Sequence, residues 1–220
     1  MNKKLIIFGN TEQAELAHYY FLNDSEYEIT AFCVNSEYIV QTTFCGLPLI
    51  PFEEIEKELN PSEYYMFVAI GYSGINKLRK KIYCQAKTKG YKLASYISSK
   101  ATIFDNVVIG DNCMILELNN LQPFVEIGNN VTIWSGNHIG HNSKIGDNCF
   151  ITSHAVISGG VIIEQDCFIG VNSSIRDHII IKKENIIGAG SIIMRSTHDK
   201  EVFIPKRTLK SKFLSDDIMI

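Results

Sequence analysis

A large aliphatic residue recurs at every sixth position through the second half of the chain. In steps of six, the series runs from Ile97 to Ile193 without a gap, and every member is isoleucine except Leu121. The residue two positions earlier is mostly small or β-branched, and glycine often follows the aliphatic residue. A strict six-residue period fits neither a helix of about 3.6 residues per turn nor a simple amphipathic strand. It is typical of a parallel β-helix built from hexapeptides.

The period also predicts how the coils of this β-helix stack. If three hexapeptides close one triangular coil, residues eighteen apart lie above one another. This places Cys149 beneath Cys167, and puts Gly110, Gly128 and Gly146 in one corner column. Glycine at a corner permits tight backbone angles that a Cβ atom would resist. Burial of each aliphatic side chain contributes roughly 1.5–3 kcal/mol, so the series itself can hold about five to six coils together.

The first part of the chain, about ninety residues, follows a different pattern, in which apolar strands alternate with helices. Strands are predicted at 4–8, 27–34 and 65–70, and helices at 12–22 and 75–89. The turns after the first and last of these strands read Gly9-Asn10-Thr11 and Gly71-Tyr72-Ser73-Gly74. The alternation predicts a small parallel sheet, a Rossmann-like α/β module, with ligand at the carboxyl ends of its strands. The first turn lacks the full Gly-x-Gly-x-x-Gly fingerprint, and a tight βα connection explains its glycine equally well.

Charge and cysteine content exclude several classes of protein. The formal net charge is −3 and the pI is near 6.1. Lysine and arginine are scattered, so no nucleic-acid partner is expected. The apolar run from Leu5 to Phe8 is too short for a signal peptide or a membrane span, so a cytoplasmic protein without a membrane partner is expected. The six cysteines form no Cys-x-x-Cys pair, which argues against a disulfide framework and a zinc finger.

Together, the short α/β module, the connecting stretch YKLASYI and the gapless coil resemble one known family. Residues 97–193 are similar to the left-handed β-helix of hexapeptide-repeat acyltransferases. The chain up to about residue 195 resembles the bacterial sialic acid O-acetyltransferase and UDP-amino-sugar N-acetyltransferase family. The resemblance implies a left-handed coil, although parallel crossovers are usually right-handed.

The same resemblance implies a division of the chain and an assembly. It places a Rossmann-like nucleotide-sugar-binding domain at 1–94 and a left-handed β-helix that binds acetyl-CoA and carries out catalysis at 95–195. A C-terminal tail then occupies 196–220. The resemblance further implies a homotrimer with its active sites between subunits.

Three histidines, His138, His141 and His154, raise two alternatives for the chemistry of the coil. A zinc site needs ligands that converge to about 2.0–2.1 Å from the metal. On a three-sided coil His141 and His154 fall on different faces and diverge, so no metal is expected. Acyl transfer needs only one of these histidines, because one neutral imidazole near pH 7 can take a proton from an attacking amine or hydroxyl.

The resemblance assigns the residues of such a site. The family's base lies four residues before an Ile-Gly pair, which matches His141 in the stretch HNSKIG. Asn142 stands where many members have Asp or Glu, so it is expected to hydrogen-bond without offsetting an imidazolium charge. Gly159 is implied as the N–H donor to the thioester oxyanion and as a contact of acetyl-CoA. Such a donor typically stabilises the transition state by about 3 kcal/mol. The wall for the pantetheine arm is implied at Gly170, Val171, Gly188 and Ala189.

Substrate contacts are implied in the first domain, at Asn35 and at the turn residues Gly9, Asn10, Thr11, Gly71, Tyr72 and Ser73. Two positions depart from the family pattern. Asn35 replaces a common acidic residue, and Phe150 replaces a histidine nine residues after the base. The ending VFIPKRTLK also differs from the usual Gly-x-Pro-Ala close, so no adenine contact is assigned there. The substrate edge of the site is therefore expected to differ from that of the best-matched relatives.

These assignments predict an acetyl-CoA-dependent N-acetyltransferase that acts on the amino group of a nucleotide-linked amino-dideoxy sugar. The product would enter a bacterial surface polysaccharide such as capsule or the O-antigen of lipopolysaccharide. One alternative is O-acetylation of a sugar of the sialic acid type. Another is a trimer that binds nucleotide sugar without catalysis.

Overall fold

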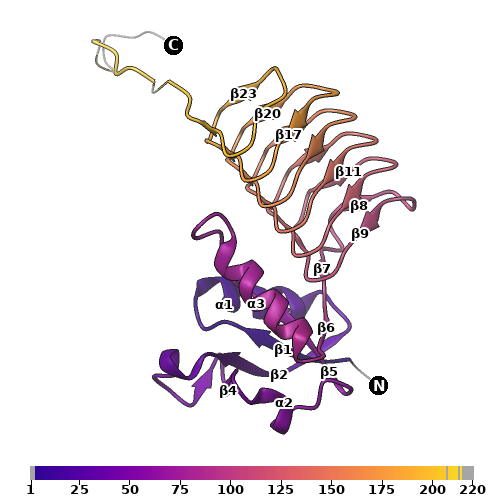
Figure 1. The fold of residues 1–220 in the computed structure, drawn as a ribbon, viewed down its shortest axis with the longest axis vertical. Coiled ribbons are helices and arrows are strands. Elements are labelled where there is room, and N and C mark those ends of the chain that lie inside the picture. The colour runs from indigo at the N-terminus through magenta and orange to yellow at the C-terminus, as the bar shows by residue number, and fades with distance from the viewer. Residues whose placement is uncertain (1–2, 207, 213, 215–220) are drawn as a thin grey trace.

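The computed structural model describes residues 3–206, 208–212 and 214, and it consists of two parts (Figure 1). An α/β module comes first, and a tall three-sided coil of short parallel strands rises from it. This confirms the predicted Rossmann-like module followed by a left-handed β-helix of hexapeptides. Among the described helices, none combines the length and the hydropathy needed to cross a bilayer.

The module is built on one sheet with the strand order β3-β4-β2-β1-β5-β6. Its strands are β1 (Lys3–Phe8), β2 (Tyr27–Val34), β3 (Thr43–Phe44), β4 (Leu47–Pro51), β5 (Tyr64–Val68) and β6 (Lys92–Leu93). Neighbouring strands are parallel except β3, which pairs antiparallel with β4. The predicted strands at 4–8 and 27–34 are confirmed, and the third ends at Val68, before residue 70. The pattern of apolar residues did not predict β3 and β4.

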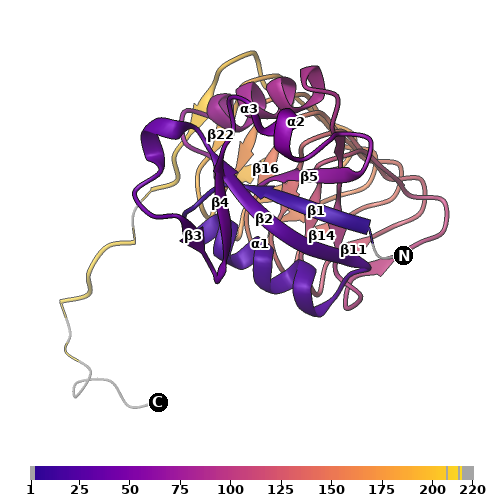
Figure 2. The same cartoon turned by 90° about the horizontal axis from the view of Figure 1, so that it is seen from below.

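Helices cover both faces of this sheet (Figure 2). Leu5 and Ile7 point to the face covered by α1 (Glu12–Asn23), whose Phe21 is fully buried there. Ile6 and Phe8 point to the opposite face. That face is covered by α2 (Ile55–Glu58) and α3 (Lys77–Thr88). A short 3-10 helix, η1 (Ser36–Tyr38), follows β2.

Helix α3 begins at Lys77, two residues later than predicted, because the backbone before it is left-handed. Ile75 has a φ of 54° and Asn76 a φ of 63°. The side-chain Nδ2 of Asn76 is buried and donates to the carbonyl of Cys167 in the coil at 3.3 Å. This tertiary contact fixes the position of the helix start, and the local sequence carries no sign of it.

The coil has three faces, each a parallel sheet whose adjacent strands are eighteen residues apart. The first face contains β7 (Tyr96–Ile97), β10 (Met114–Ile115), β13 (Thr132–Ile133), β16 (Phe150–Ile151), β19 (Phe168–Ile169), β22 (Ile186–Ile187) and β24 (Val202–Phe203). The second face contains β8 (Thr102–Ile103), β11 (Asn120–Leu121), β14 (His138–Ile139), β17 (Val156–Ile157), β20 (Ser174–Ile175) and β23 (Ile192–Ile193). The third face contains β9 (Val108–Ile109), β12 (Glu126–Ile127), β15 (Lys144–Ile145), β18 (Ile162–Ile163) and β21 (Ile180–Ile181). Corners are named below by the two faces that they join.

The sheet pairing confirms three hexapeptides per coil, and the aliphatic series fills the interior. From Ile115 to Ile187 each member of the series is at most 3% exposed. Cys149 and Cys167 are buried in the same core, as predicted from their spacing. The connecting stretch YKLASYI is shared between two sheets, since β6 belongs to the module and β7 opens the coil. At the other end β24 continues the first face beyond Ile193.

The corner glycines are required for a different reason from the predicted one. Gly110, Gly128 and Gly146 do not adopt positive φ angles. Instead, a Cβ atom on Gly110 would lie 2.6 Å from the carbonyl oxygen of Gly128, and one on Gly128 would lie 2.8 Å from the backbone N of Asp147. The left-handed angles fall two residues later, on Asn112, Asn130 and Asn148. Close approach of successive coils excludes a side chain, and asparagine makes the turn.

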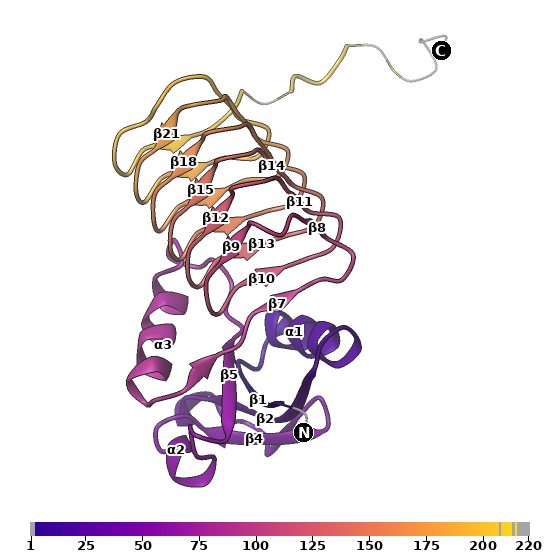
Figure 3. The same ribbon diagram turned by 90° about the vertical axis from the view of Figure 1, so that its right-hand side faces the viewer.

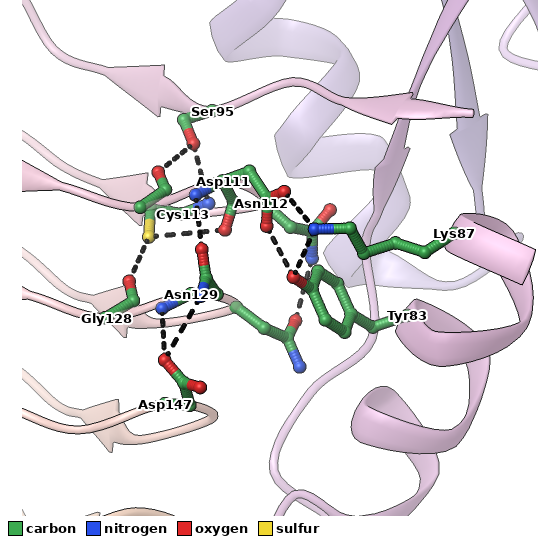
Figure 4. Close-up of polar contacts among 11 residues, drawn as sticks. Tyr83, Lys87, Ser95, Asp111, Asn112, Cys113, Gly128, Asn129 and Asp147 are labelled. Atoms are coloured by element: carbon green, nitrogen blue, oxygen red, sulfur yellow. Dashed lines mark hydrogen bonds and ion pairs between the residues drawn. The ribbon is translucent and has the colours of Figure 1, made fainter. Parts of the chain in front are cut away.

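The module is attached to the first face of the coil and to the two corners beside it. At the third-to-first corner, Asp111 accepts hydrogen bonds from the Tyr83 hydroxyl and the Lys87 Nζ, both at 2.6 Å (Figure 4). Asn112 Oδ1 accepts from the backbone N–H of Val68 at 2.8 Å. Figure 3 shows α3 lying beside the lower coils. These contacts bury the outward side chains of the lower strands of the first face.

Candidate active site

His141 lies at the second-to-third corner, between β14 and β15. Neighbouring coils hold its backbone from both sides. Its N–H donates to the side-chain Oε1 of Gln122 at 3.0 Å, and its carbonyl accepts from the N–H of Gly160 at 2.8 Å. The side chain is exposed, so a substrate can reach it.

The ring of His141 is oriented by the residue that follows it. Its Nδ1 lies 3.0 Å from Oδ1 of Asn142, which has a left-handed φ of 60°. An amide oxygen only accepts hydrogen bonds, so this contact holds the proton on Nδ1 and leaves the lone pair on Nε2. His141 is thereby set to accept a proton at Nε2. Asn142 carries no charge, so it would not balance a positive charge on the imidazole.

Gly159 lies one coil above His141, directly against its ring. A Cβ atom on Gly159 would lie 2.8 Å from Nε2 and 2.9 Å from Cε1 of His141. The carbonyl of Gly159 accepts from the N–H of His178 at 3.0 Å, but within the described part of the chain its own N–H has no hydrogen-bond partner. An unpaired backbone N–H on a residue that packs against an imidazole can stabilise a negative oxygen as a tetrahedral intermediate forms.

The residues expected to line the pantetheine arm lie at a different corner. Gly170 and Val171 follow β19, and Gly188 and Ala189 follow β22, so all four occupy the first-to-second corner. The two pairs stack closely, since a Cβ atom on Gly170 would lie 2.5 Å from the backbone N of Ala189. Within one chain, the structure therefore brings these residues together with one another but does not bring them to His141.

A cavity of about 430 Å³ lies at the carboxyl ends of β1, β2 and β5, where the sequence predicts a ligand. Its lining includes six of the seven expected substrate residues, Gly9, Asn10, Thr11, Asn35, Gly71 and Ser73. The seventh, Tyr72, turns its ring towards the coil, 5.0 Å from the ring of Phe150. Glycine is required at position 9, because its φ is +139° and a Cβ atom would lie 2.9 Å from the carbonyl oxygen of Ala69.

Three further polar residues in the cavity lining were not predicted, Glu37, Tyr38 and Lys81. Lys81 is the only cation among the described lining residues, and it could pair with a phosphate. The side-chain Nδ2 of Asn10 donates to the carbonyl of Tyr38 at 3.1 Å, which links the turn after β1 to η1. Lys81 lies one turn into α3, the helix that follows β5. Because the first turn of such a helix lies near the carboxyl end of the strand, the sequence could have indicated Lys81 as a cavity residue.

The cavity and His141 lie on different sides of the coil. The module that contains the cavity packs on the first face, where Tyr96, Met114 and Phe150 are buried. In a triangular coil, the second-to-third corner lies opposite the first face. One chain therefore does not bring its own cavity to its own His141.

The other histidines form no group with His141. His138 points outward on the second face, where it is in register with Asn120 and Val156. His154 lies at the first-to-second corner against Gly136, whose Cβ position is 2.6 Å from the ring. Among the described residues, no group of three His, Cys, Asp or Glu side chains is placed to hold a metal ion.

Comparison with family models places the coil among bacterial transferase repeats. The bacterial transferase hexapeptide model, described as six repeats, matches residues 106–140 and 124–159. The model for the hexapeptide repeat of succinyl-transferase matches residues 160–195. Comparison with curated proteins finds no match.

Solved structures share the fold over nearly the whole chain. The acetyltransferase domain of PglB from Neisseria gonorrhoeae is 23% identical, with a TM-score of 0.82, and the match covers 91% of this chain and 96% of that one. PerB from Caulobacter crescentus, in complex with CoA and GDP-perosamine, is 21% identical, with a TM-score of 0.80 and coverage of 92% and 94%. WeeI from Acinetobacter baumannii is 20% identical, with a TM-score of 0.74 and coverage of 88% and 92%.

Proposed function

Because the coil of this chain belongs to the bacterial hexapeptide-repeat transferases, we propose that the protein is an acetyl-CoA-dependent N-acetyltransferase. Its acceptor is the amino group of a nucleotide-linked amino-dideoxy sugar. The observation that carries the proposal is the pair formed by Nε2 of His141 and the unpaired N–H of Gly159, one coil apart. The fold shared with PerB, whose structure contains CoA and GDP-perosamine, supports the choice of both substrates.

In the proposed reaction, the sugar amine attacks the thioester carbonyl carbon and a C–N bond forms. Nε2 of His141 accepts the proton that the amine loses. The Gly159 N–H donates to the carbonyl oxygen as it becomes negative. The C–S bond then breaks, and the leaving thiolate takes the proton from the imidazolium, which releases CoA and returns His141 to its starting state.

The neighbour of His141 favours an amine over a hydroxyl acceptor. An unprotonated amine is the better nucleophile and makes a smaller demand on the base. A hydroxyl needs its proton removed as it attacks, and a carboxylate beside the imidazole would help by balancing the positive charge. Asn142 provides an acceptor for Nδ1 but no such charge. This is why we place N-acetylation ahead of O-acetylation of a sugar.

The position of the cavity supports an assembly as part of the proposal. The 430 Å³ cavity, with its exposed Lys81, is suited to a nucleoside diphosphate, and its Gly9 turn leads into the start of α1. Since the cavity and His141 of one chain lie on opposite sides of the coil, a second copy has to supply the base. A homotrimer closes this arrangement, with each site shared by two subunits.

CoA release by the purified protein tests the proposed function. We expect thiol release that depends on both acetyl-CoA and a nucleotide-linked amino sugar, with acetylated amine as the product by mass spectrometry. UDP-, dTDP- and GDP-linked amino sugars are compared with matched sugars that carry a hydroxyl in place of the amine. Release with hydroxyl acceptors only would indicate O-acetylation. Binding of the nucleotide sugars without release would indicate a non-catalytic trimer.

A further inference from the structure

An aromatic cluster lies on the first face of the coil, beside the nucleotide-sized cavity. Phe150 and Phe168 point outward from the adjacent strands β16 and β19, and their rings stack with centroids 6.1 Å apart. The ring of Tyr72 lies against both, 5.0 Å from Phe150 and 4.9 Å from Phe168. Because Gly71 and Ser73 line the cavity, Tyr72 stands at its edge.

This cluster has a rigid base and an accessible upper side. Phe150 is 1% exposed, and the buried guanidinium of Arg79 lies 5.3 Å from its ring centroid. Arg79 donates to the hydroxyl of Thr132 at 3.1 Å and to the carbonyls of Asn148 and Cys149 at 2.9 and 3.1 Å. These three hydrogen bonds hold its guanidinium in place against the ring of Phe150. Tyr72, in contrast, is 53% exposed, and Phe168 is partly exposed.

The accessible side continues up the first face as an apolar strip. Ile186 follows Phe168 in register, and Val202, which is 57% exposed, follows Ile186. The charged groups beside the strip, Lys80 and Asp166, are paired with each other at 2.8 Å. A group that lies on this strip therefore meets mainly aromatic and aliphatic carbon.

From this arrangement we propose that Tyr72 and Phe168 determine specificity by binding the deoxygenated edge of the acceptor sugar. The inference rests on the proposed function. Tyr72 stands at the edge of the cavity, so the sugar of a nucleotide held there contacts its ring where it leaves the cavity on this side. A methyl group gains from burial against aromatic carbon, whereas a hydroxyl placed there would lose its hydrogen bonds to water.

The position of Phe150 agrees with the binding of an apolar sugar edge on this strip. It lies on the first face, across the coil from His141 of its own chain, and it stands where the resembled family has a histidine. Replacement of an imidazole by a phenyl ring removes a hydrogen-bonding group from the floor of the strip. The floor is thus suited to an apolar part of the substrate.

The test compares two nucleotide-linked amino sugars that differ only at the exocyclic carbon, one with a methyl and one with a hydroxymethyl group. In the intact wild-type assembly we expect kcat/KM to favour the methyl sugar by about 10-fold or more, the discrimination typical of an apolar pocket. Tyr72→Ala should reduce this preference to about 3-fold or less. Tyr19→Ala is the matched control, because Tyr19 is 62% exposed on α1, away from the strip, and it should leave the preference unchanged.

Calorimetric binding of the same two sugars and of the bare nucleoside diphosphate separates this inference from the proposed function. If no sugar is turned over, but the methyl sugar binds more tightly and Tyr72→Ala abolishes that difference, the proposed function fails and the specificity assignment stands. Turnover of both sugars at equal efficiency by the wild type would overturn the assignment and leave the proposed function standing. A methyl preference that survives in both Tyr72→Ala and Phe168→Leu would also overturn it.

Discussion

At the scale of single residues, the functional assignment depends on the contact between His141 and Gly159. The ring of His141 occupies the space that a side chain at position 159 would need, since the distance from the Cβ position to Nε2 is 2.8 Å. The glycine thus has two roles. It leaves room for the imidazole, and it presents an N–H that no other described group uses.

Gly159→Ala should therefore lower kcat by about 100-fold or more, the loss typical of a disturbed oxyanion donor. The added methyl group displaces the ring of His141, while the fold of the coil stays intact. Steady-state kinetics and thermal unfolding are measured together. Ser158→Ala, one residue earlier, is the control and should keep nearly full activity. Unchanged kcat in Gly159→Ala would remove this glycine from the mechanism.

Some residues of the site can be identified from the sequence, and others only from the fold. His141 could be found because it stands at a fixed offset from an isoleucine in the repeat. Lys81 and Tyr38 reach the cavity from a helix and a 3-10 turn that carry no repeat, and only the folded module brings them to Gly9 and Gly71. The unpaired N–H of Gly159 is likewise a property of the stacked coils and cannot be read from one hexapeptide.

At the scale of elements, the coil was predictable because its register is set by an unbroken period. A slip by one residue would turn every isoleucine outward, so the series fixes each strand. The short strands β3 and β4 carry no comparable pattern, and prolines occupy positions 48 and 51 of β4. The start of α3 is fixed by a contact between Asn76 and the coil. The positions of these short strands and of the helix start are therefore set by contacts with residues outside the local sequence.

The contact between α1 and the first turn of the coil gives a test at this scale. Asp24, which follows α1, accepts hydrogen bonds from the N–H of Ser99 at 2.9 Å and the hydroxyl of Tyr96 at 2.8 Å. The Ser99 N–H is the main cause of the lowered pKa of Asp24. A lowered pKa in the folded state means that the carboxylate stabilises the fold above the unfolded pKa, about 4, and that this contribution is lost as the pH falls through the folded value.

Asp24→Asn should accordingly lower the thermal unfolding midpoint at pH 7 by about 2–4 °C. The difference from wild type should shrink as the pH falls from about 4 through the lowered pKa of Asp24, below which the wild-type carboxyl group is also neutral. Thermal unfolding followed by circular dichroism across this range makes the comparison. Asp105→Asn, at an exposed position of the coil, serves as the control and should change neither value. A pH-independent difference would show that the charge of Asp24 plays no part.

At the scale of the whole molecule, the separation of the cavity from His141 is the dominant feature. The module covers the lower strands of the first face of the coil, and the proposed base lies at the opposite corner. The residues expected to line the pantetheine arm lie at a third position, the first-to-second corner. The proposed homotrimer would bring these three parts to one site from two neighbouring chains.

Mixed assemblies test this arrangement. His141→Ala and Lys81→Glu should each be inactive alone, because one lacks the base and the other repels the nucleotide phosphates. When the two chains are expressed together and assemble at random, about a quarter of the shared sites combine an intact cavity with an intact histidine. Activity should then recover to about that fraction of wild type. No recovery in purified mixed assemblies would mean that the cavity and the base act within one chain.

The most direct test of the central claim is acetyl-CoA-dependent thiol release by His141→Ala, with His154→Ala as its matched control. Both histidines are exposed at corners of the coil, so neither substitution should lower the unfolding midpoint appreciably. With a nucleotide-linked amino sugar that the wild type acetylates, His141→Ala should lose about 100-fold or more in kcat, whereas His154→Ala should keep nearly all of it. Undiminished release of CoA by His141→Ala would contradict the account.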